Sequence, residues 1–366
     1  KVEEMKIVEV IVLISSFIQF CCSLQHGIRK LGRWSTDDFA DWSGSSLKFF
    51  VRTTTSSNAT IFIDLKDCLN CNYFIEYSIN CKSISAINVV NSMHSIELIV
   101  PNKLRGSVYQ ILITKKTEPS TGTIMVGDIR LKDAEITSGR RTDTCNETHQ
   151  KRMIFIGDSI SVGYGVDGQN PCPFSPDTEN VLHAYSAISA MHASADYHVI
   201  AWSGRGVVRN YGESDSTSKA LTVPELYNRT LATSGDPSLY WDPSSYQAQA
   251  ILINLGTNDY STEPHPTDEA FSTGLSTFVG VIQSDYPQAK IGLLCPFSLT
   301  DPQCGNIQSV AAERRVEYFR LSPDLVQSYG CVMHPDYTAQ QSLAKAIEPF
   351  VAKLFHLTDD KIDIRY

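Results

Sequence analysis

Four short blocks carry residue types that together could hydrolyse an ester: Ser159 in GDSI, Gly204 in WSGRG, Asn258 in GTND and His334 in HPDY. Ester hydrolysis needs an activated nucleophile, a base and hydrogen-bond donors for the developing oxyanion. Ser159 could attack the acyl carbonyl, while His334 takes its proton and later returns it to the leaving alcohol. The backbone N–H groups of Ser159 and Gly204 and the side-chain amide of Asn258 could hold the oxyanion. Alternatively, Gly204 could serve only a tight turn and Asn258 an Asx turn.

The elements around these blocks predict that one sheet edge gathers them. Short, continuous apolar runs occur at 153–156, 198–201, 250–255 and 290–294, separated by helix-compatible segments. Buried strands that alternate with helices indicate a parallel sheet covered on both faces. GDSI, WSGRG and GTND each follow one of the first three runs, and HPDY precedes the last helix. Because ligands of open α/β sheets bind at the carboxyl ends of the strands, we expect the four blocks to meet there.

This set of blocks resembles the SGNH, or GDSL, hydrolase family, which supplies Ser, Gly, Asn and His in the same order. Ser161 stands where a G-x-S-x-G elbow has its second glycine, which disfavours an ordinary α/β-hydrolase. The strings GDSISVGYG (157–165) and SGRGVVRN (203–210) look like carbohydrate esterase family 2, as do GRW (32–34) and WSG (42–44). Members of that family deacetylate polysaccharides and join a jelly-roll domain to an SGNH domain. The resemblance therefore implies a flavodoxin-like three-layer α/β/α domain with a parallel sheet, preceded by an all-β jelly-roll sandwich.

The segment before the first block has the pattern of that sandwich. Short β-rich runs are separated by turn residues at regular intervals, at 47–52, 60–64, 73–79, 95–100, 108–113 and 122–126. Many short strands with this spacing predict an antiparallel sandwich, with a jelly roll as the expected form. We predict a signal peptide at 1–23, the sandwich domain at 24–137, a polar linker at 138–150 and the hydrolase domain at 151–366.

Other residues near the blocks are candidates for the substrate site. We predict substrate-site positions for Asp158, Arg209 and Met333. Asp158 is better suited to accept hydrogen bonds than to act as a catalytic acid, and Arg209 and Asn210 could line the cleft or lie on the surface. Met333 stands where the resembling family often has an aromatic residue near the substrate, so we expect no sugar stacking at that point.

The block around His334 departs from the family pattern. Most SGNH enzymes have an Asp three residues before the His, to orient the imidazole, and here that position is Cys331. The resemblance to carbohydrate esterase family 2 implies a Ser-His dyad in place of a triad, and we expect a main-chain carbonyl near 331 or 332 to orient the His. Asp336, the nearest carboxylate in the sequence, is the alternative. We also predict that Cys331 forms a disulfide bond, with Cys172 or Cys304.

The first residues and the cysteines predict an oxidising compartment. Residues 7–22 are almost wholly apolar and fit a secretory signal peptide. A membrane span is the alternative, but Glu9 interrupts the run. Cleavage near Ser23 would remove two of the ten cysteines, and the remaining eight indicate disulfides. A zinc site is the alternative for the group at 68–81. Three N-glycosylation sequons agree with secretion and begin at Asn58, Asn146 and Asn228.

Composition narrows the function classes. Of the 366 residues, 42% are hydrophobic and 19% charged, which is a globular composition. The net charge of −9 without a basic run argues against nucleic-acid binding. We expect a secreted monomer without metal or cofactor and without stable membrane insertion, whose substrate is an acetylated carbohydrate. Two other functions are alternatives: an esterase for lipid or other small acyl esters that uses the same residues, and an inactive protein whose sandwich domain binds glycans.

Overall fold

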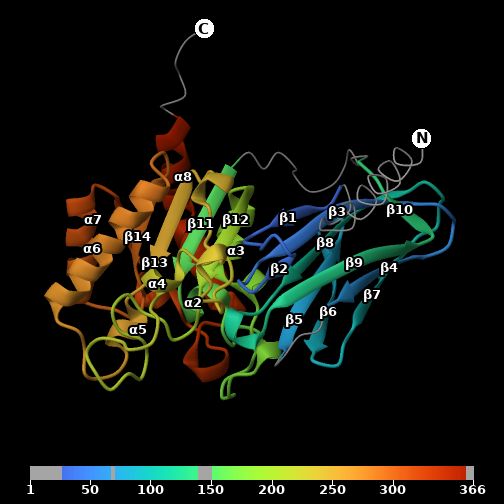
Figure 1. The fold of residues 1–366 in the computed structure, drawn as a ribbon. Helices are drawn as coiled ribbons and strands as arrows, with labels where there is room; N and C mark the ends of the chain where they lie inside the picture. The colour runs from blue at the N-terminus through green and yellow to red at the C-terminus, as the bar shows by residue number, and fades with distance from the viewer. Residues whose placement is uncertain (1–26, 67–70, 139–150, 360–366) are drawn as a thin grey trace, which may run out of the picture.

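The computed structural model describes residues 27–66, 71–138 and 151–359, and it places two antiparallel sheets before one parallel sheet (Figure 1). The signal peptide expected at 1–23 and nearly all of the linker expected at 138–150 lie outside the described residues. Among the described helices, none has both the length and the hydropathy needed to cross a bilayer.

Two antiparallel sheets form the sandwich. The first has the order β1-β3-β8-β5-β6, with β10 also paired to β3, and the second has the order β2-β9-β4-β7. The strands of the first sheet are β1 (Arg29–Leu31), β3 (Ser46–Thr53), β8 (Val108–Lys115), β5 (Asn72–Ile79), β6 (Lys82–Val90) and β10 (Ala134–Ile136). Those of the second are β2 (Phe39–Ala40), β9 (Ile124–Lys132), β4 (Ala59–Leu65) and β7 (Ser95–Val100).

Alternation along the strands builds the sandwich core. In β4, Ala59, Ile61, Ile63 and Leu65 are buried, and the residues between them are partly exposed. Successive side chains of a strand point to opposite faces, so one face of β4 packs inward. Residues from both sheets share one apolar cluster with these four. The predicted all-β sandwich is thereby confirmed.

The parallel sheet follows, in the order β12-β11-β13-β14-β15. Numbered along the chain this order is 2-1-3-4-5, the flavodoxin-like arrangement that the resemblance implies. All four strand pairs are parallel. The strands are β11 (Lys151–Gly157), β12 (Ala195–Ala201), β13 (Ala250–Asn254), β14 (Lys290–Cys295) and β15 (Glu317–Arg320).

Helices cover both faces of this sheet, which confirms the three-layer prediction (Figure 1). Residues of α6 (Asp268–Asp285) and α7 (Gln303–Arg314) pack on one face, and those of α3 (Tyr185–His192) and α8 (Tyr337–Asp359) pack on the other. The strands have apolar side chains toward both layers. This explains why their sequences are continuous apolar runs rather than alternating ones.

The two family-like strings of the sandwich, GRW and WSG, lie against the parallel-sheet part of the chain. Trp42 is buried within the apolar cluster of α6 and α7, and its Nε1 donates to the carbonyl oxygen of Arg229 at 3.2 Å. Arg33 is wholly buried and donates to the same oxygen at 2.8 Å. The Asp41 carboxylate accepts the N–H of Ala232 at 2.8 Å. A buried guanidinium and a buried carboxylate, each hydrogen-bonded across the contact, fix how the sandwich meets the parallel sheet.

Candidate active site

Ser159 lies at the carboxyl end of β11. The strand ends at Gly157, and the single-turn helix α2 (Ser159–Val162) begins directly after it. Asp158 caps this helix, because its side chain accepts the N–H of Ile160 at 3.1 Å. The turn from strand to helix therefore presents the Ser159 hydroxyl at the sheet edge where α/β proteins bind their ligands.

His334 lies against Ser159. Its Nε2 is 2.9 Å from the hydroxyl oxygen of Ser159, and its Nδ1 is 3.0 Å from the carbonyl oxygen of Val332. A carbonyl only accepts hydrogen bonds, so Nδ1 bears the proton and Nε2 is free to take the proton of Ser159. Burial lowers the pKa of His334 below its usual 6.5, and hydrogen bonds to the backbone of Val332 and Cys331 oppose that shift. The imidazole is therefore a neutral base at neutral pH.

The loop that leads to His334 is tied down on both sides. A disulfide joins Cys331 to Cys172, one of the two partners expected from the sequence. The N–H of Cys331 donates to the carbonyl oxygen of Gly165 at 2.9 Å, and that of Val332 donates to Cys172 at 3.1 Å. Val332 and Met333 have φ of 53° and 56°, in the left-handed region that a β-branched valine adopts only at a cost. The disulfide and these hydrogen bonds hold the conformation that directs the Val332 carbonyl at His334.

Asp336 has other partners. Its carboxylate accepts the hydroxyl of Ser328 at 2.6 Å and the N–H of Ala339 at 2.9 Å, which caps the start of α8. In the described part of the chain, no carboxylate is hydrogen-bonded to His334. The arrangement therefore has the geometry of the dyad and not that of the Asp336 alternative.

The Gly204 turn and Asn258 come together next to Asp158, the residue directly before Ser159. The N–H of Arg205 donates to the carbonyl oxygen of Trp202 at 3.2 Å, and Gly204 has φ of +79°. This is a type II turn, whose third residue needs positive φ. Asn258 follows β13 in the short helix α5 (Thr257–Tyr260), and its Nδ2 lies 2.9 Å from the Arg205 carbonyl oxygen and 3.4 Å from Asp158. The Asn258 amide thus joins the Gly204 turn to the cap of the Ser159 helix.

Asp259, the last residue of GTND, holds the backbone of the loop at 207–209, a role that was not predicted from the sequence. Its buried carboxylate accepts the N–H groups of Val207, Val208 and Arg209 at 2.9 to 3.1 Å. Burial raises its pKa to about 6, and these hydrogen bonds oppose the shift. A Cβ on Gly206 would lie 2.6 Å from the Asp259 carboxylate, so only glycine fits there. The one available signal was an acidic residue directly after Asn258 in the same block.

The three predicted substrate-site residues have very different surroundings. Arg209 is wholly buried and donates to the carbonyl oxygens of Glu213 and Asp215 at 2.6 and 3.0 Å. Its side chain has no exposed surface, so it holds its loop instead, and both interpretations offered from the sequence are corrected. Asp158 is 1% exposed, and burial raises its pKa to about 7. It acts as the helix cap rather than facing solvent. Met333 is 59% exposed beside His334 and remains open to a substrate.

The ring of Tyr164 packs on the imidazole and is backed by Phe174. The ring of Tyr164 stacks on Phe174 at 4.0 Å between centroids and lies 4.6 Å from the ring of His334. This wall restricts the rotation of the imidazole and adds an apolar surface at the site. Sequence reasoning missed both residues, although Tyr164 belongs to the string GDSISVGYG.

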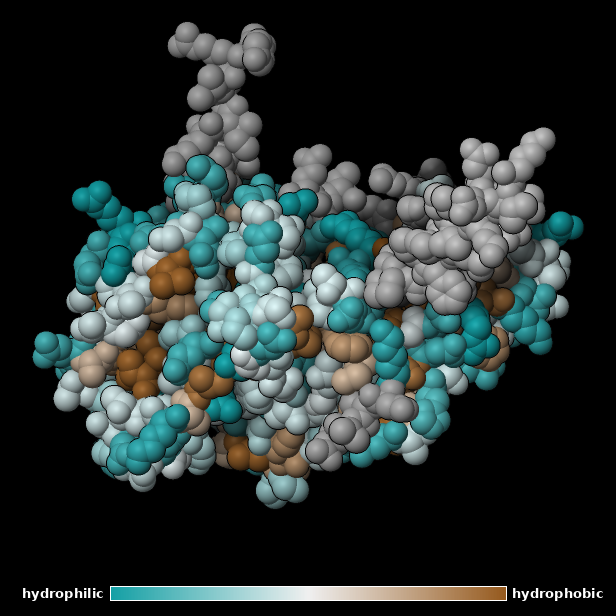
Figure 2. All heavy atoms as spheres, in the orientation of Figure 1, coloured by the Kyte–Doolittle hydropathy of each residue, from teal (hydrophilic) through white to brown (hydrophobic). Residues whose placement is uncertain are grey.

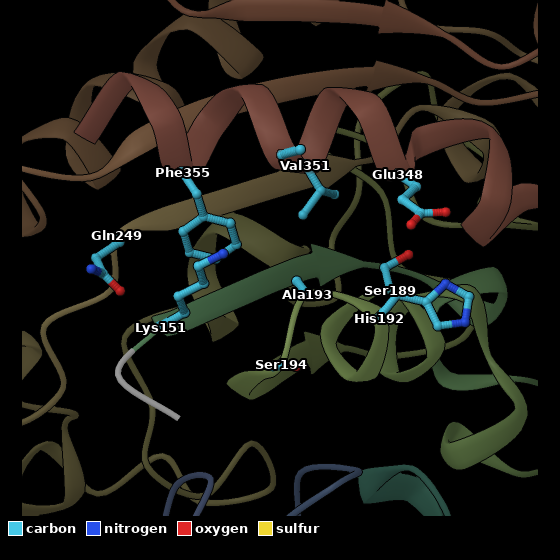
Figure 3. A pocket seen from close by; sticks show the side chains of 10 residues that line it. Lys151, Ser189, His192, Ala193, Ser194, Gln249, Glu348, Val351 and Phe355 are labelled. Carbon is cyan, nitrogen blue, oxygen red and sulfur yellow. The ribbon is translucent and has the colours of Figure 1, made fainter. Parts of the chain in front are cut away.

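A cavity of about 790 Å³ lies elsewhere, at the amino ends of the parallel strands (Figure 3). Side chains of α3 and α8 face each other across it, and none of the four block residues lines it. On the face shown in Figure 2, apolar residues form separate patches among hydrophilic ones. Within the described ranges, no group of three or more His, Cys, Asp or Glu residues could hold a metal ion.

Comparison with known proteins gives one family match. Residues 155–360 match the family model described as GDSL-like Lipase/Acylhydrolase family. The chain is 32% identical over 203 residues to the cellulase/esterase CelE of Acetivibrio thermocellus, covering 55% of this chain and 23% of CelE. It is 36% identical over 217 residues to an acetylxylan esterase / glucomannan deacetylase of Cellvibrio japonicus, covering 54% of this chain and 58% of that protein. The chain thus spans less than two thirds of each curated relative.

Solved structures match over the sandwich and the parallel sheet together. A family 2 carbohydrate esterase with a carbohydrate-binding domain, from Corynascus thermopiles (Myceliophthora fergusii), superposes with a TM-score of 0.78 at 25% identity. The match covers 90% of this chain and 99% of that one. A family 2 carbohydrate esterase from Clostridium thermocellum, in complex with cellohexaose, gives 0.76 at 24% identity and covers 89% and 98%. At 24% identity, the similarity to the Clostridium thermocellum structure shows a shared fold alone.

Proposed function

The chain belongs to the GDSL-like lipase/acylhydrolase family, and from this premise we propose that it is a secreted carbohydrate O-acetylesterase. The observation that carries the proposal is the position of His334, with Nε2 2.9 Å from Ser159 and Nδ1 3.0 Å from the Val332 carbonyl. Two successive hydrogen bonds thus connect a nucleophile, its base and an acceptor that orients the base. Covalent ester hydrolysis uses this arrangement.

The first half of the reaction transfers the acetyl group to the protein. Ser159 attacks the acetyl carbonyl carbon while its proton passes to Nε2 of His334, and the carbonyl oxygen becomes an oxyanion. The backbone N–H groups of Ser159 and Gly204 and the Asn258 amide donate to that oxygen. To do so, the Asn258 amide gives up its longer contact, the 3.4 Å one to Asp158. The intermediate collapses, and the sugar hydroxyl leaves with the proton from Nε2.

The second half removes the acetyl group with water. His334 takes a proton from a water molecule, whose oxygen attacks the acetyl-Ser159 carbonyl, and the same donors hold the second oxyanion. Collapse returns the proton from Nε2 to the Ser159 oxygen and releases acetic acid, which loses its proton to solvent and leaves as acetate. In both halves the imidazolium is stabilised by the Val332 carbonyl dipole at Nδ1 rather than by a carboxylate.

The names of the relatives and the surroundings of the site support a carbohydrate acetyl ester as substrate. Two of the matched proteins are named as a cellulase/esterase and an acetylxylan esterase / glucomannan deacetylase. Tyr164, backed by Phe174, gives an aromatic surface at the base, and Met333 beside the base is exposed. We therefore propose an acetylated polysaccharide or its oligosaccharides as the substrate class.

Secretion and the domain boundaries belong to the same proposal. The Cys172–Cys331 and Cys295–Cys304 disulfides are typical of an oxidising compartment. Of the three sequon asparagines, Asn58 and Asn228 are exposed, as glycosylation requires, and Asn146 lies outside the described residues. We propose a leader at 1–23, a sandwich domain at 24–137, a linker at 138–150 and a hydrolase domain at 151–366.

A comparison of acyl chain lengths tests the proposal against its two rivals. The purified protein is assayed with p-nitrophenyl acetate, a long-chain p-nitrophenyl ester, acetylated xylan and acetylated glucomannan. We expect turnover of the acetyl esters and acetate release from at least one polysaccharide. A preference for the long-chain ester would favour a lipid esterase. Glycan binding without hydrolysis of any ester would favour an inactive binding protein.

A further inference from the structure

We propose that Glu118, a residue of the sandwich, positions the Gly204 turn of the active site. Glu118 lies between β8 and the 3₁₀ turn η2 (Pro119–Thr121) and is only 3% exposed. One oxygen of its carboxyl group accepts the backbone N–H of Ser203 at 2.8 Å. The inference rests on the proposed function, because it concerns the donor that Gly204 supplies to the oxyanion.

Glu118 is itself held firmly. Its backbone carbonyl accepts hydrogen bonds from the buried ammonium of Lys115 at 2.9 Å and from the hydroxyl of Thr121 at 2.8 Å. The second oxygen of its carboxyl group accepts the hydroxyl of Ser120. The first two bonds hold the backbone of Glu118 and the third holds its carboxyl group, so the oxygen that contacts Ser203 is supported at both ends of the residue.

The contact falls on the residue that decides the orientation of the Gly204 N–H. In the turn from Trp202 to Arg205, Ser203 and Gly204 are the two central residues. Type I and type II turns differ by a flip of the peptide between those two residues, which carries the Gly204 N–H. The φ of +79° at Gly204 selects type II. Glu118 holds Ser203 on one side of that peptide and so favours the orientation in which the Gly204 N–H stays outside the turn, free for an oxyanion.

A second carboxylate of the sandwich provides a matched comparison. Asp41 is also buried and accepts backbone N–H groups across the same contact, from Ala232 at 2.8 Å and Thr233 at 2.9 Å. It holds a different loop from Glu118, since residues 232 and 233 belong to none of the four blocks. A variant of Asp41 therefore measures the effect of weakening the contact between the sandwich and the parallel sheet. A variant of Glu118 measures, in addition, the effect of losing the hydrogen bond to the Gly204 turn.

The experiment separates the effect of the side-chain length at position 118 from the effect of its charge. Glu118→Gln keeps an oxygen at the right distance from Ser203 but has no charge, whereas Glu118→Asp keeps the charge and is one methylene too short. We measure kcat and KM for p-nitrophenyl acetate and the rate at which an alkyl fluorophosphonate labels Ser159. Asp41→Asn is the control, and thermal unfolding is recorded for each variant. If Glu118→Asp does not fold, Glu118→Met replaces it, because Met fills a similar volume without an acceptor.

We expect Glu118→Asp to lower kcat and the labelling rate about tenfold or more, a part of the loss seen when a whole oxyanion donor is removed. KM should change little, and Glu118→Gln should stay close to the wild type. Asp41→Asn should unfold at a lower temperature with kcat preserved. The positioning role is wrong if Glu118→Asp reacts as fast as the wild type, if Glu118→Gln is equally slow, or if Asp41→Asn loses as much kcat. A wild type that neither turns over nor is labelled would instead refute the proposed function.

Discussion

The carbonyl oxygen of Val332 lies 3.0 Å from Nδ1 of His334, in the place where most SGNH hydrolases have a carboxylate. The same loop thus supplies both the base and the group that orients it. A carbonyl has a dipole but no charge, so it fixes the tautomer of His334 without strongly favouring the imidazolium. Burial lowers the pKa of His334, and the hydrogen bond to the Val332 carbonyl opposes that shift only in part.

The first prediction concerns pH. His334 must be neutral to accept the proton of Ser159, and its pKa lies below the usual 6.5. As pH rises, kcat/KM should therefore increase as His334 loses its proton, with a midpoint below about pH 6.5. A pH profile of acetyl ester hydrolysis tests this. An acid limb with its midpoint above pH 7 would mean that a negative charge acts on His334.

The second prediction separates stability from activity at Asp336. Its carboxylate caps α8 through the N–H of Ala339 and is not bonded to His334. Asp336→Ala should cost about 1 kcal/mol in the free energy of unfolding and leave kcat unchanged, and Asp336→Asn should keep the cap. Urea unfolding and steady-state kinetics measure the two effects. A large fall in kcat for Asp336→Ala with normal stability would assign Asp336 to the catalytic machinery.

The third prediction compares two disulfides. Cys172 and Cys331 are 159 residues apart and Cys295 and Cys304 are nine. By loop entropy, replacing each pair with serines should lower the free energy of unfolding by about 4–5 and about 2–3 kcal/mol, respectively. Only the first replacement should also lower kcat, because Cys331 anchors the loop of Val332. Equal kcat in both double variants would show that the disulfide does not shape the site.

The fourth prediction compares two glycines of one loop. A Cβ on Gly204 would meet only Tyr211, at 3.9 Å, so Gly204→Ala costs mainly the strain of positive φ, about 1–2 kcal/mol. The variant should fold with a reduced kcat, because relief of the strain turns the N–H away. A Cβ on Gly206 would lie 2.0 Å from the Arg209 carbonyl oxygen, so Gly206→Ala should not fold normally. Circular dichroism and kinetics distinguish the two outcomes. Full kcat in Gly204→Ala would remove Gly204 from the oxyanion site.

The residues that sequence reasoning placed best are those whose position follows from local pattern. Ser159 and Asn258 each follow a buried strand directly, and parallel strands bring their carboxyl ends to one edge. The continuous apolar runs of the buried strands were therefore sufficient to predict that these blocks lie together. The disulfide at Cys331 could be narrowed to two partners but not to one, because pairing depends on the tertiary fold.

The residues that were missed or misjudged act over long sequence separations. Glu118 contacts Ser203 from 85 positions away, and Asp259 holds a loop about 50 positions before it. Arginine is usually found on the surface or in a substrate site. Arg209 is nevertheless buried, and it donates to backbone carbonyl groups whose positions the sequence pattern does not predict. Buried polar groups need partners wherever the fold supplies them, so their roles become visible only in three dimensions.

Acetate release from acetylated glucomannan, measured for the wild type beside Ser159→Ala, tests the central claim most directly. We predict steady release by the wild type and a fall of about a thousandfold or more in the variant, because the attacking hydroxyl is removed while the oxyanion donors remain. Thermal unfolding of the variant should match the wild type. Release by Ser159→Ala at the wild-type rate, or no release by a folded wild type on any acetylated polysaccharide, would contradict the account.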